Sequence, residues 1–187
     1  MKPFLIFLLS VCCCISHAQT GKSTNRPTFH SINLLGFLNG EAGSEPLVQT
    51  INGIQVKTYS MGIGVGLDYY KQRSVPVFLD IRKNIFRKAQ SPFVYLDGGY
   101  HFLWSNNKPK EWIRTNEKGG LYYDLGIGYS FPASKTAAVQ VSFGYSVKNM
   151  SEKVNQYPWR SSWPSPEDYQ QLNYTLRRYS FKMGLSL

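Results

Sequence analysis

Cysteine is confined to the start of this 187-residue chain, where all three cysteines lie at positions 12–14. The segment that contains them begins with the basic Lys2, continues with an apolar run and ends in the triplet Ser-His-Ala. This is the layout of a secretory signal peptide, and the apolar run is too short for a membrane-spanning helix. We therefore predict a signal peptide at 1–18 and a single mature domain at 19–187, without disulfides or thiol chemistry.

Histidine is also scarce, since the mature chain has only His30 and His101. Neither is spaced with carboxylates as metal ligands are, so we predict no metal site and no cofactor. A catalytic triad of Asp97, His101 and Ser105 fails on geometry, because the first two residues would lie about 13 Å apart along an extended strand. We therefore expect a protein that is not an enzyme.

Acidic residues are few, with 11 against 21 basic ones. Removing Lys2 with the signal peptide leaves a mature chain with a formal charge of 20 − 11 = +9. Export argues against a nucleic-acid partner, and the basic residues mostly fall between the predicted strands. The expected counter-charge is an anionic surface such as lipid headgroups or lipopolysaccharide phosphates.

In place of helical periodicity, the mature chain has a two-residue alternation of bulky and small side chains, clearest at 60–70. In an extended strand such residues fall on opposite faces. A helix would scatter them around its circumference, and each glycine would cost it about 1 kcal/mol relative to alanine. The bulky residues are Met61, Ile63, Val65, Leu67 and Tyr69, and the small face carries Gly62, Gly64, Gly66 and Asp68.

The same alternation predicts eight strands and no helix of any length. The strands are expected at 28–38, 47–56, 59–70, 75–82, 93–104, 121–130, 139–147 and 178–187. The second is the least regular, because Asn52-Gly53 within it could instead form a hairpin. If both termini lie on one side, a turn-forming run at 39–46 and the long loops 105–119 and 148–173 lie on the other. Long loops on one side and short turns on the other are typical of an outer-membrane barrel.

Every acidic residue inside the predicted strands lies on the small face, together with three basic residues. The seven are Asp68, Asp80, Arg82, Asp97, Asp124, Arg178 and Lys182. A strand surface that faces water normally carries lysine, glutamate and threonine rather than glycine, serine and single aspartates. We therefore predict that the small face lines the interior, where these residues pair as a polar network that plugs the lumen.

The bulky face carries no charge, and its aromatic residues cluster near strand ends, as membrane-interface girdles do. A charge at the bilayer midplane costs about 2–4 kcal/mol, so an uncharged outer surface is expected where lipid is the neighbour. The pattern favours an all-β fold, a single eight-stranded antiparallel up-and-down transmembrane β-barrel. The alternative is a soluble periplasmic barrel that buries its bulky face and carries apolar ligands.

The chain resembles the small eight-stranded outer-membrane β-barrel proteins of Gram-negative bacteria over nearly all of its mature length. The resemblance is carried by GIGVGLDYY (62–70), VPVFLDIR (75–82), PFVYLDGGY (92–100) and GGLY (119–122). The final segment, 178–187, is similar to the C-terminal strand that the outer-membrane assembly machinery reads, although that signal usually ends in an aromatic residue and this chain ends in Leu187. The resemblance implies a monomer in contact with outer-membrane lipid, placed there after secretion to the periplasm.

That family is defined by shape rather than by one activity, so we expect function in the outward loops. Loop 148–173 combines aromatic anchors with basic charge and is the predicted contact for lipopolysaccharide, a glycan or a protein partner. Its candidate contact residues are Tyr157, Trp159, Arg160, Trp163 and Tyr169. A solvated loop with membrane-interface tryptophans explains it equally well. The alternative function is a lipid-modifying enzyme of the lipid A deacylase or acyltransferase type, with His101 as its base.

Overall fold

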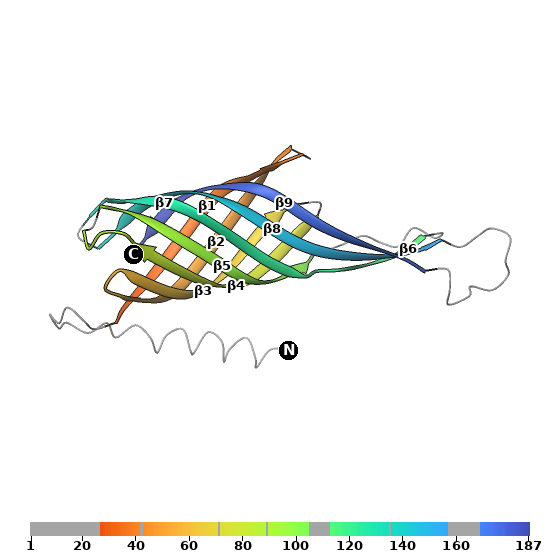
Figure 1. The fold of residues 1–187 in the computed structure, drawn as a ribbon, viewed down its shortest axis with the longest axis horizontal. Helices are drawn as coiled ribbons and strands as arrows, with labels where there is room; N and C mark the ends of the chain where they lie inside the picture. Colours follow the sequence, from red (N-terminus) through yellow and green to blue (C-terminus); the bar gives the residue numbers. More distant parts are fainter. Residues whose placement is uncertain are drawn as a thin grey trace, which may run out of the picture.

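The computed structural model describes residues 27–41, 43–70, 72–88, 90–104, 113–134, 136–156 and 169–187, which form nine β-strands (Figure 1). The strands are β1 (Thr28–Gly40), β2 (Gly43–Val56), β3 (Tyr59–Tyr69), β4 (Arg73–Asn84), β5 (Ser91–Leu103), β6 (Ile113–Lys118), β7 (Leu121–Pro132), β8 (Ala138–Gln156) and β9 (Tyr169–Ser186). Within the described ranges, no helix is long and apolar enough to cross a membrane. The predicted signal peptide at 1–18 lies outside these ranges.

Eight of the nine strands close into an antiparallel barrel, which confirms the predicted fold class. The order around the wall is β1-β2-β3-β4-β5-β7-β8-β9, and β9 returns to pair with β1 through a ladder that joins 179–186 to 32–39. With β6 set aside, each wall strand pairs with the wall strand that follows it in the chain, so the topology is up-and-down. Closure gives each wall strand a partner on both sides and so removes the exposed edges of an open sheet.

The first hairpin turns at a different place from either sequence prediction. Pairing between β1 and β2 continues out to Gly40 and Gly43, so most of the run predicted as a turn at 39–46 is strand. Gly43 has a φ of +107°, a conformation that favours glycine and that lets the chain reverse there. The alternative hairpin at Asn52-Gly53 is wrong, because Asn52 lies inside β2 with Ser31 on one side and Ile63 on the other.

A second departure from prediction is a sheet that extends beyond the barrel wall. β8 and β9 remain paired as far as Asn155 and Tyr169, and β6 pairs with 151–156 of β8. Figure 1 shows this three-stranded extension projecting from the end of the barrel opposite the C-terminus. The predicted loops 105–119 and 148–173 therefore contain strands. They were not predicted because a sheet outside the barrel has no core to impose a regular alternation.

Two glycines join this extension to the wall. Lys118 of β6 pairs with Ser151, and Tyr122 of β7 pairs with Lys148, so Gly119 and Gly120 connect two strands that both run along β8. A Cβ at Gly119 would lie 1.8 Å from the carbonyl oxygen of His101, and one at Gly120 would lie 2.4 Å from that of Asn149. Only glycine allows so close an approach of neighbouring backbones.

The bulky face points outward and the small face inward, as predicted. The side chains of Val65 and Leu125 are 43% and 59% exposed, whereas Asp68 and Asp124 are 1% and 0% exposed. A soluble barrel would show the reverse arrangement. The outer surface is therefore an apolar belt, and the core of the molecule lies inside the cylinder.

Candidate functional sites: a filled lumen and an outward extension

The structure places all seven residues of the predicted network inside the barrel, with every side chain at most 6% exposed. Three of the carboxylates form a row across neighbouring strands. Asp80 of β4 is in register with Asp97 of β5, which is in register with Asp124 of β7. Side chains opposite each other on adjacent strands lie about 4.5–5.5 Å apart at Cβ, so this row concentrates negative charge that needs compensation.

Two basic side chains compensate the row. Lys182, which projects from β9, donates from Nζ to Asp124 Oδ2 at 3.1 Å and to Asp97 Oδ2 at 3.4 Å. Arg82, two residues along β4 from Asp80, donates from Nε to both oxygens of that carboxylate at 2.8 and 3.1 Å. Its Nη1 also donates to Gln140 Oε1 at 2.8 Å. Each carboxylate of the row therefore has a cationic neighbour.

The fourth aspartate pairs with a residue that the sequence prediction missed. Lys148 Nζ donates to both oxygens of Asp68 at 2.6 and 2.7 Å and to Ser74 Oγ at 2.7 Å, and the lysine is fully buried. Lys148 had been assigned to the loop after the seventh strand. The signal was present, because the inward series Gln140, Ser142, Gly144 and Ser146 continues to Lys148 at the same two-residue spacing.

Arg178 does not pair with an aspartate, contrary to the predicted pairing. Its described hydrogen bonds go to main-chain carbonyls, from Nη2 to Tyr70 at 2.5 Å and from Nη1 to Leu38 and Gly43 at 3.4 Å. These carbonyls belong to the ends of three different wall segments. The hydroxyl of the nearby Tyr70 donates to Ser146 Oγ at 2.5 Å.

The charges inside the barrel balance, and apolar side chains occupy the remaining space. Asp68, Asp80, Asp97 and Asp124 face Arg82, Lys148, Arg178 and Lys182, four charges of each sign. A buried apolar cluster lies beside them and is formed by Ile32, Leu34, Ile51, Phe78 and Tyr122. Packing is close enough that a Cβ at Gly144 would lie 2.1 Å from Tyr95 Oη, which itself donates to Asp124 Oδ1 at 2.9 Å. Side chains from all eight wall strands thus fill the lumen, as expected for an eight-stranded barrel.

His101 is buried beside the backbone of β8. Its Nε2 lies 2.8 Å from the carbonyl oxygen of Asn149, and its side chain is 1% exposed. Ser105, the nucleophile of the triad weighed from the sequence, lies outside the described residues. Among the residues that are described, no group of three or more His, Cys, Asp and Glu side chains could hold a metal ion.

Comparison with known proteins rests on shape, since no protein-family model and no curated protein matches the sequence. Among solved structures, the chain is similar to the outer membrane protein AlkL, determined by solid-state NMR in DMPC bilayers. The match has a TM-score of 0.53 and 9% sequence identity, and it covers 91% of this chain and 94% of AlkL. The fold is that of an outer-membrane barrel. At so low an identity, the likeness extends to the fold alone.

The predicted loop contacts fall largely beyond the structure. Tyr157, Trp159, Arg160 and Trp163 lie outside the described residues, and Tyr169 is the first residue of β9. What the structure adds is the pairing of that strand. β9 pairs with β1 over 179–186, and its outer part, 169–178, pairs with 146–155 of β8.

Proposed function

We propose that the protein is an integral barrel of the outer membrane, inserted after export by the machinery that reads its C-terminal strand. The observation that carries this proposal is the division of the two faces. Every described charged residue predicted inside the strands is buried in the lumen, while bulky apolar side chains cover the outer surface on all eight wall strands. Lipid is the environment in which such a surface is stable.

Aromatic and basic side chains mark both ends of the belt. At the end that bears the extension, Arg73 stacks on the rings of Tyr69 and Trp104, with guanidinium-to-centroid distances of 5.3 and 5.5 Å. At the end that bears the short turns, the Lys83 ammonium lies 5.2 Å from the centroid of Tyr59. Aromatic rings with basic neighbours are typical of membrane interfaces, so these residues support a bilayer between the two levels.

The membrane placement is tested by fractionation and gel mobility. We expect the protein to need detergent for extraction and to migrate differently before and after boiling, because a folded barrel resists the detergent of the gel. Release from membranes by salt or alkaline carbonate, together with a single gel mobility, would contradict the proposal.

We further propose that the outward extension binds a protein partner. The exposed or half-exposed charges described at this end are mixed in sign, which favours a protein over the phosphates of lipopolysaccharide; they are Glu41, Glu45, Arg73, Glu117, Lys118, Glu152, Lys153 and Arg177. The proposal assigns no reaction to His101.

A shortened hairpin tests this binding role. Ser151 pairs with Asn173, so replacing 152–172 by a two-residue turn removes the outer parts of β8 and β9, and with them most of the partner of β6, and leaves the wall intact. A displayed library of random peptides would be selected on the intact protein in lipid nanodiscs and counter-selected on the shortened variant. Enrichment of peptides that bind only the intact protein is expected. Extension-dependent retention of purified lipopolysaccharide, with no enriched peptide, would overturn the choice of partner.

A further inference from the structure

The apolar belt is interrupted by polar side chains on two strands only. Within the described part of the wall, the outward residues between the two aromatic levels are apolar or glycine on β3, β4, β5, β7, β8 and β9. β1 and β2 differ. Four residues here called the polar quartet, Ser31, Asn33, Thr50 and Asn52, point outward from these strands, and Asn33 and Asn52 are exposed. This explains why the second strand had the least regular pattern in the sequence.

The polar quartet is compact and has outward apolar side chains around it. Register places Asn33 opposite Thr50 and Ser31 opposite Asn52. Apolar side chains enclose the quartet on all sides: Leu35 and Val48 beyond one end, Phe29 and Ile54 beyond the other, Ile63 and Val65 on β3, and Leu185 and Leu187 on β9. The four side chains therefore lie among apolar side chains of the outer surface.

None of the four side chains makes a hydrogen bond within the described chain. The hydrogen bonds of the described residues include none from a side chain of the quartet, although Asn33 and Thr50 are neighbours in register. A polar group exposed to hydrocarbon without a hydrogen-bond partner is unfavourable, and polar side chains within a membrane commonly join one protein segment to another. A partner that satisfies the quartet must therefore supply both hydrogen-bond donors and hydrogen-bond acceptors.

We infer that the polar quartet is the centre of an interface with a second copy of this chain. Amides and hydroxyls both donate and accept, so a two-fold axis through the patch brings each group to a group of the same kind at matching spacing. The four side chains carry no charge, so they would not repel the same side chains of a second copy. Lipid esters only accept hydrogen bonds, so they could pair with the amide N–H groups but would leave the amide oxygens without a donor. This inference rests on the membrane placement proposed above, and it replaces the monomer expected from the sequence.

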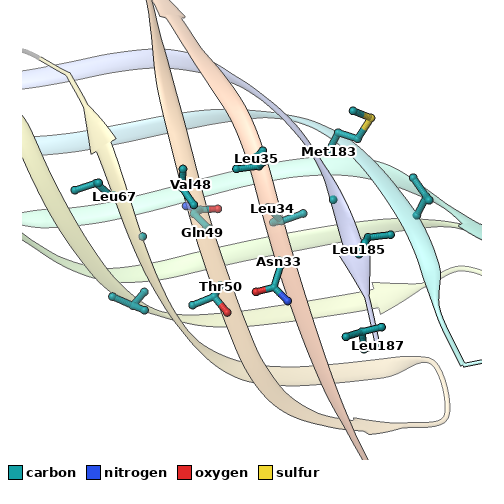
Figure 2. Close-up of a pocket in the computed structure, with 14 residues that line it drawn as sticks. Asn33, Leu34, Leu35, Val48, Gln49, Thr50, Leu67, Met183, Leu185 and Leu187 are labelled. Carbon is teal, nitrogen blue, oxygen red and sulfur yellow. The ribbon is translucent and has the colours of Figure 1, made fainter. Parts of the chain in front are cut away.

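The surface around the quartet has the shape that such an interface requires. A hollow of about 840 Å³ lies on the outer face beside Asn33 and Thr50 (Figure 2). Residues of five neighbouring strands line it, among them the outward Leu35, Val48, Leu67 and Met183. Apolar side chains around a polar centre give a second copy both area to bury and a place for its projecting residues.

Single cysteines test the interface, since the mature chain is predicted to have none. Asn33→Cys and Asn52→Cys would be made in the purified protein, reconstituted in vesicles of phosphatidylethanolamine and phosphatidylglycerol and oxidised. The matched control is Leu125→Cys, an exposed belt residue on β7. We expect at least about fivefold more disulfide-linked dimer from one of the quartet positions than from position 125. Equal yields at all three positions would overturn the inference.

A second variant removes the polar groups without a cysteine. Asn33→Leu combined with Thr50→Val and Asn52→Leu should abolish the dimer in mild detergent, as measured by sedimentation, and should retain the heat-dependent gel shift. A dimer that persists in this variant would overturn the inference, as would cross-linking in native membranes to a protein of different mass. Loss of the gel shift in the unmodified protein would instead contradict the membrane placement, so the two failures are distinguishable.

Discussion

Single residues decide whether the lumen is stable. Asp80, Asp97 and Asp124 are like charges in register on adjacent strands, an arrangement that is unfavourable by itself. Lys182 contacts two of them and is fully buried, so its ammonium is the group whose removal leaves the most uncompensated charge. Breaking a buried ion pair from one side is much more costly than replacing all partners together.

Lys182→Met is therefore expected to lower the free energy of unfolding by about 3–5 kcal/mol. A urea titration of the protein in vesicles, followed by tryptophan fluorescence, measures this change. The combination of Lys182→Met with Asp97→Asn and Asp124→Asn should recover most of the loss, because no unpaired charge remains. Lys153→Met, at an exposed lysine of the extension, is the control and should leave the midpoint nearly unchanged. An equal midpoint for Lys182→Met and the unmodified protein would contradict the assigned role.

Residue alternation predicted the lumen residues because a wall strand has two chemically different faces. It failed at Lys148 because the predicted strand ended one residue too early, although the alternation itself continued. The alternation also could not predict which basic residue pairs with which aspartate. Which cation meets which aspartate depends on the stagger of strands around the closed wall, and the alternation within one strand carries no information about that stagger.

At the scale of elements, Arg178 fastens the first hairpin to the wall. Its guanidinium contacts carbonyls of Leu38 in β1, Gly43 at the start of β2 and Tyr70 just after β3. The aliphatic part of the same side chain lies against Gly40, where a Cβ would be 2.9 Å from Arg178 Cγ. One side chain of β9 thus holds the outward ends of three other strands together.

Arg178→Met is expected to loosen the β1–β2 hairpin while the barrel stays closed, because three main-chain carbonyls lose their donor. Hydrogen exchange measured by mass spectrometry should show faster exchange in peptides covering 39–46 and unchanged exchange in β5 and β7. Arg177→Met, the exposed neighbouring residue, is the matched control and should leave the hairpin protected. Unchanged protection of the hairpin in Arg178→Met would contradict this role of Arg178. It would show that the backbone hydrogen bonds between β1 and β2 are enough to protect the hairpin.

The extension is the element that the sequence concealed. Strands were predicted where one side chain in two must be apolar, and β6 with the outer parts of β8 and β9 has no interior to impose that rule. The wall strands, by contrast, lie between an outward apolar surface and a lumen-facing surface along their length. Their existence and faces were predictable, while their extent beyond the wall was not.

At the scale of the whole molecule, the lumen is a packed core rather than a passage. Charges of both signs, hydrogen-bonded polar groups and an apolar cluster fill the interior, with Phe78 and Tyr122 in edge contact at 5.4 Å between ring centroids. Small barrels of eight strands leave little room beyond that needed for side chains. Solutes are therefore expected to pass around this protein and not through it.

We accordingly expect no steady conductance when the purified protein is placed in a planar lipid bilayer. A porin with a water-filled channel, recorded in the same membrane, serves as the positive control. Regular conductance steps that scale with salt concentration would contradict a filled lumen. The gel shift on boiling would confirm in parallel that the silent protein is folded.

The acidic and basic residues of the lumen are separated along the chain. The four aspartates lie on β3, β4, β5 and β7, whereas Lys148, Arg178 and Lys182 come from the last two strands. Arg82 of β4 already contacts Asp80, but a nascent sheet that ends at β7 holds three further aspartates whose lysine partners have not yet docked. Completion of the cylinder and electrical compensation of its interior are the same event, so a chain truncated before β8 should stay unassembled rather than persist as a partial wall.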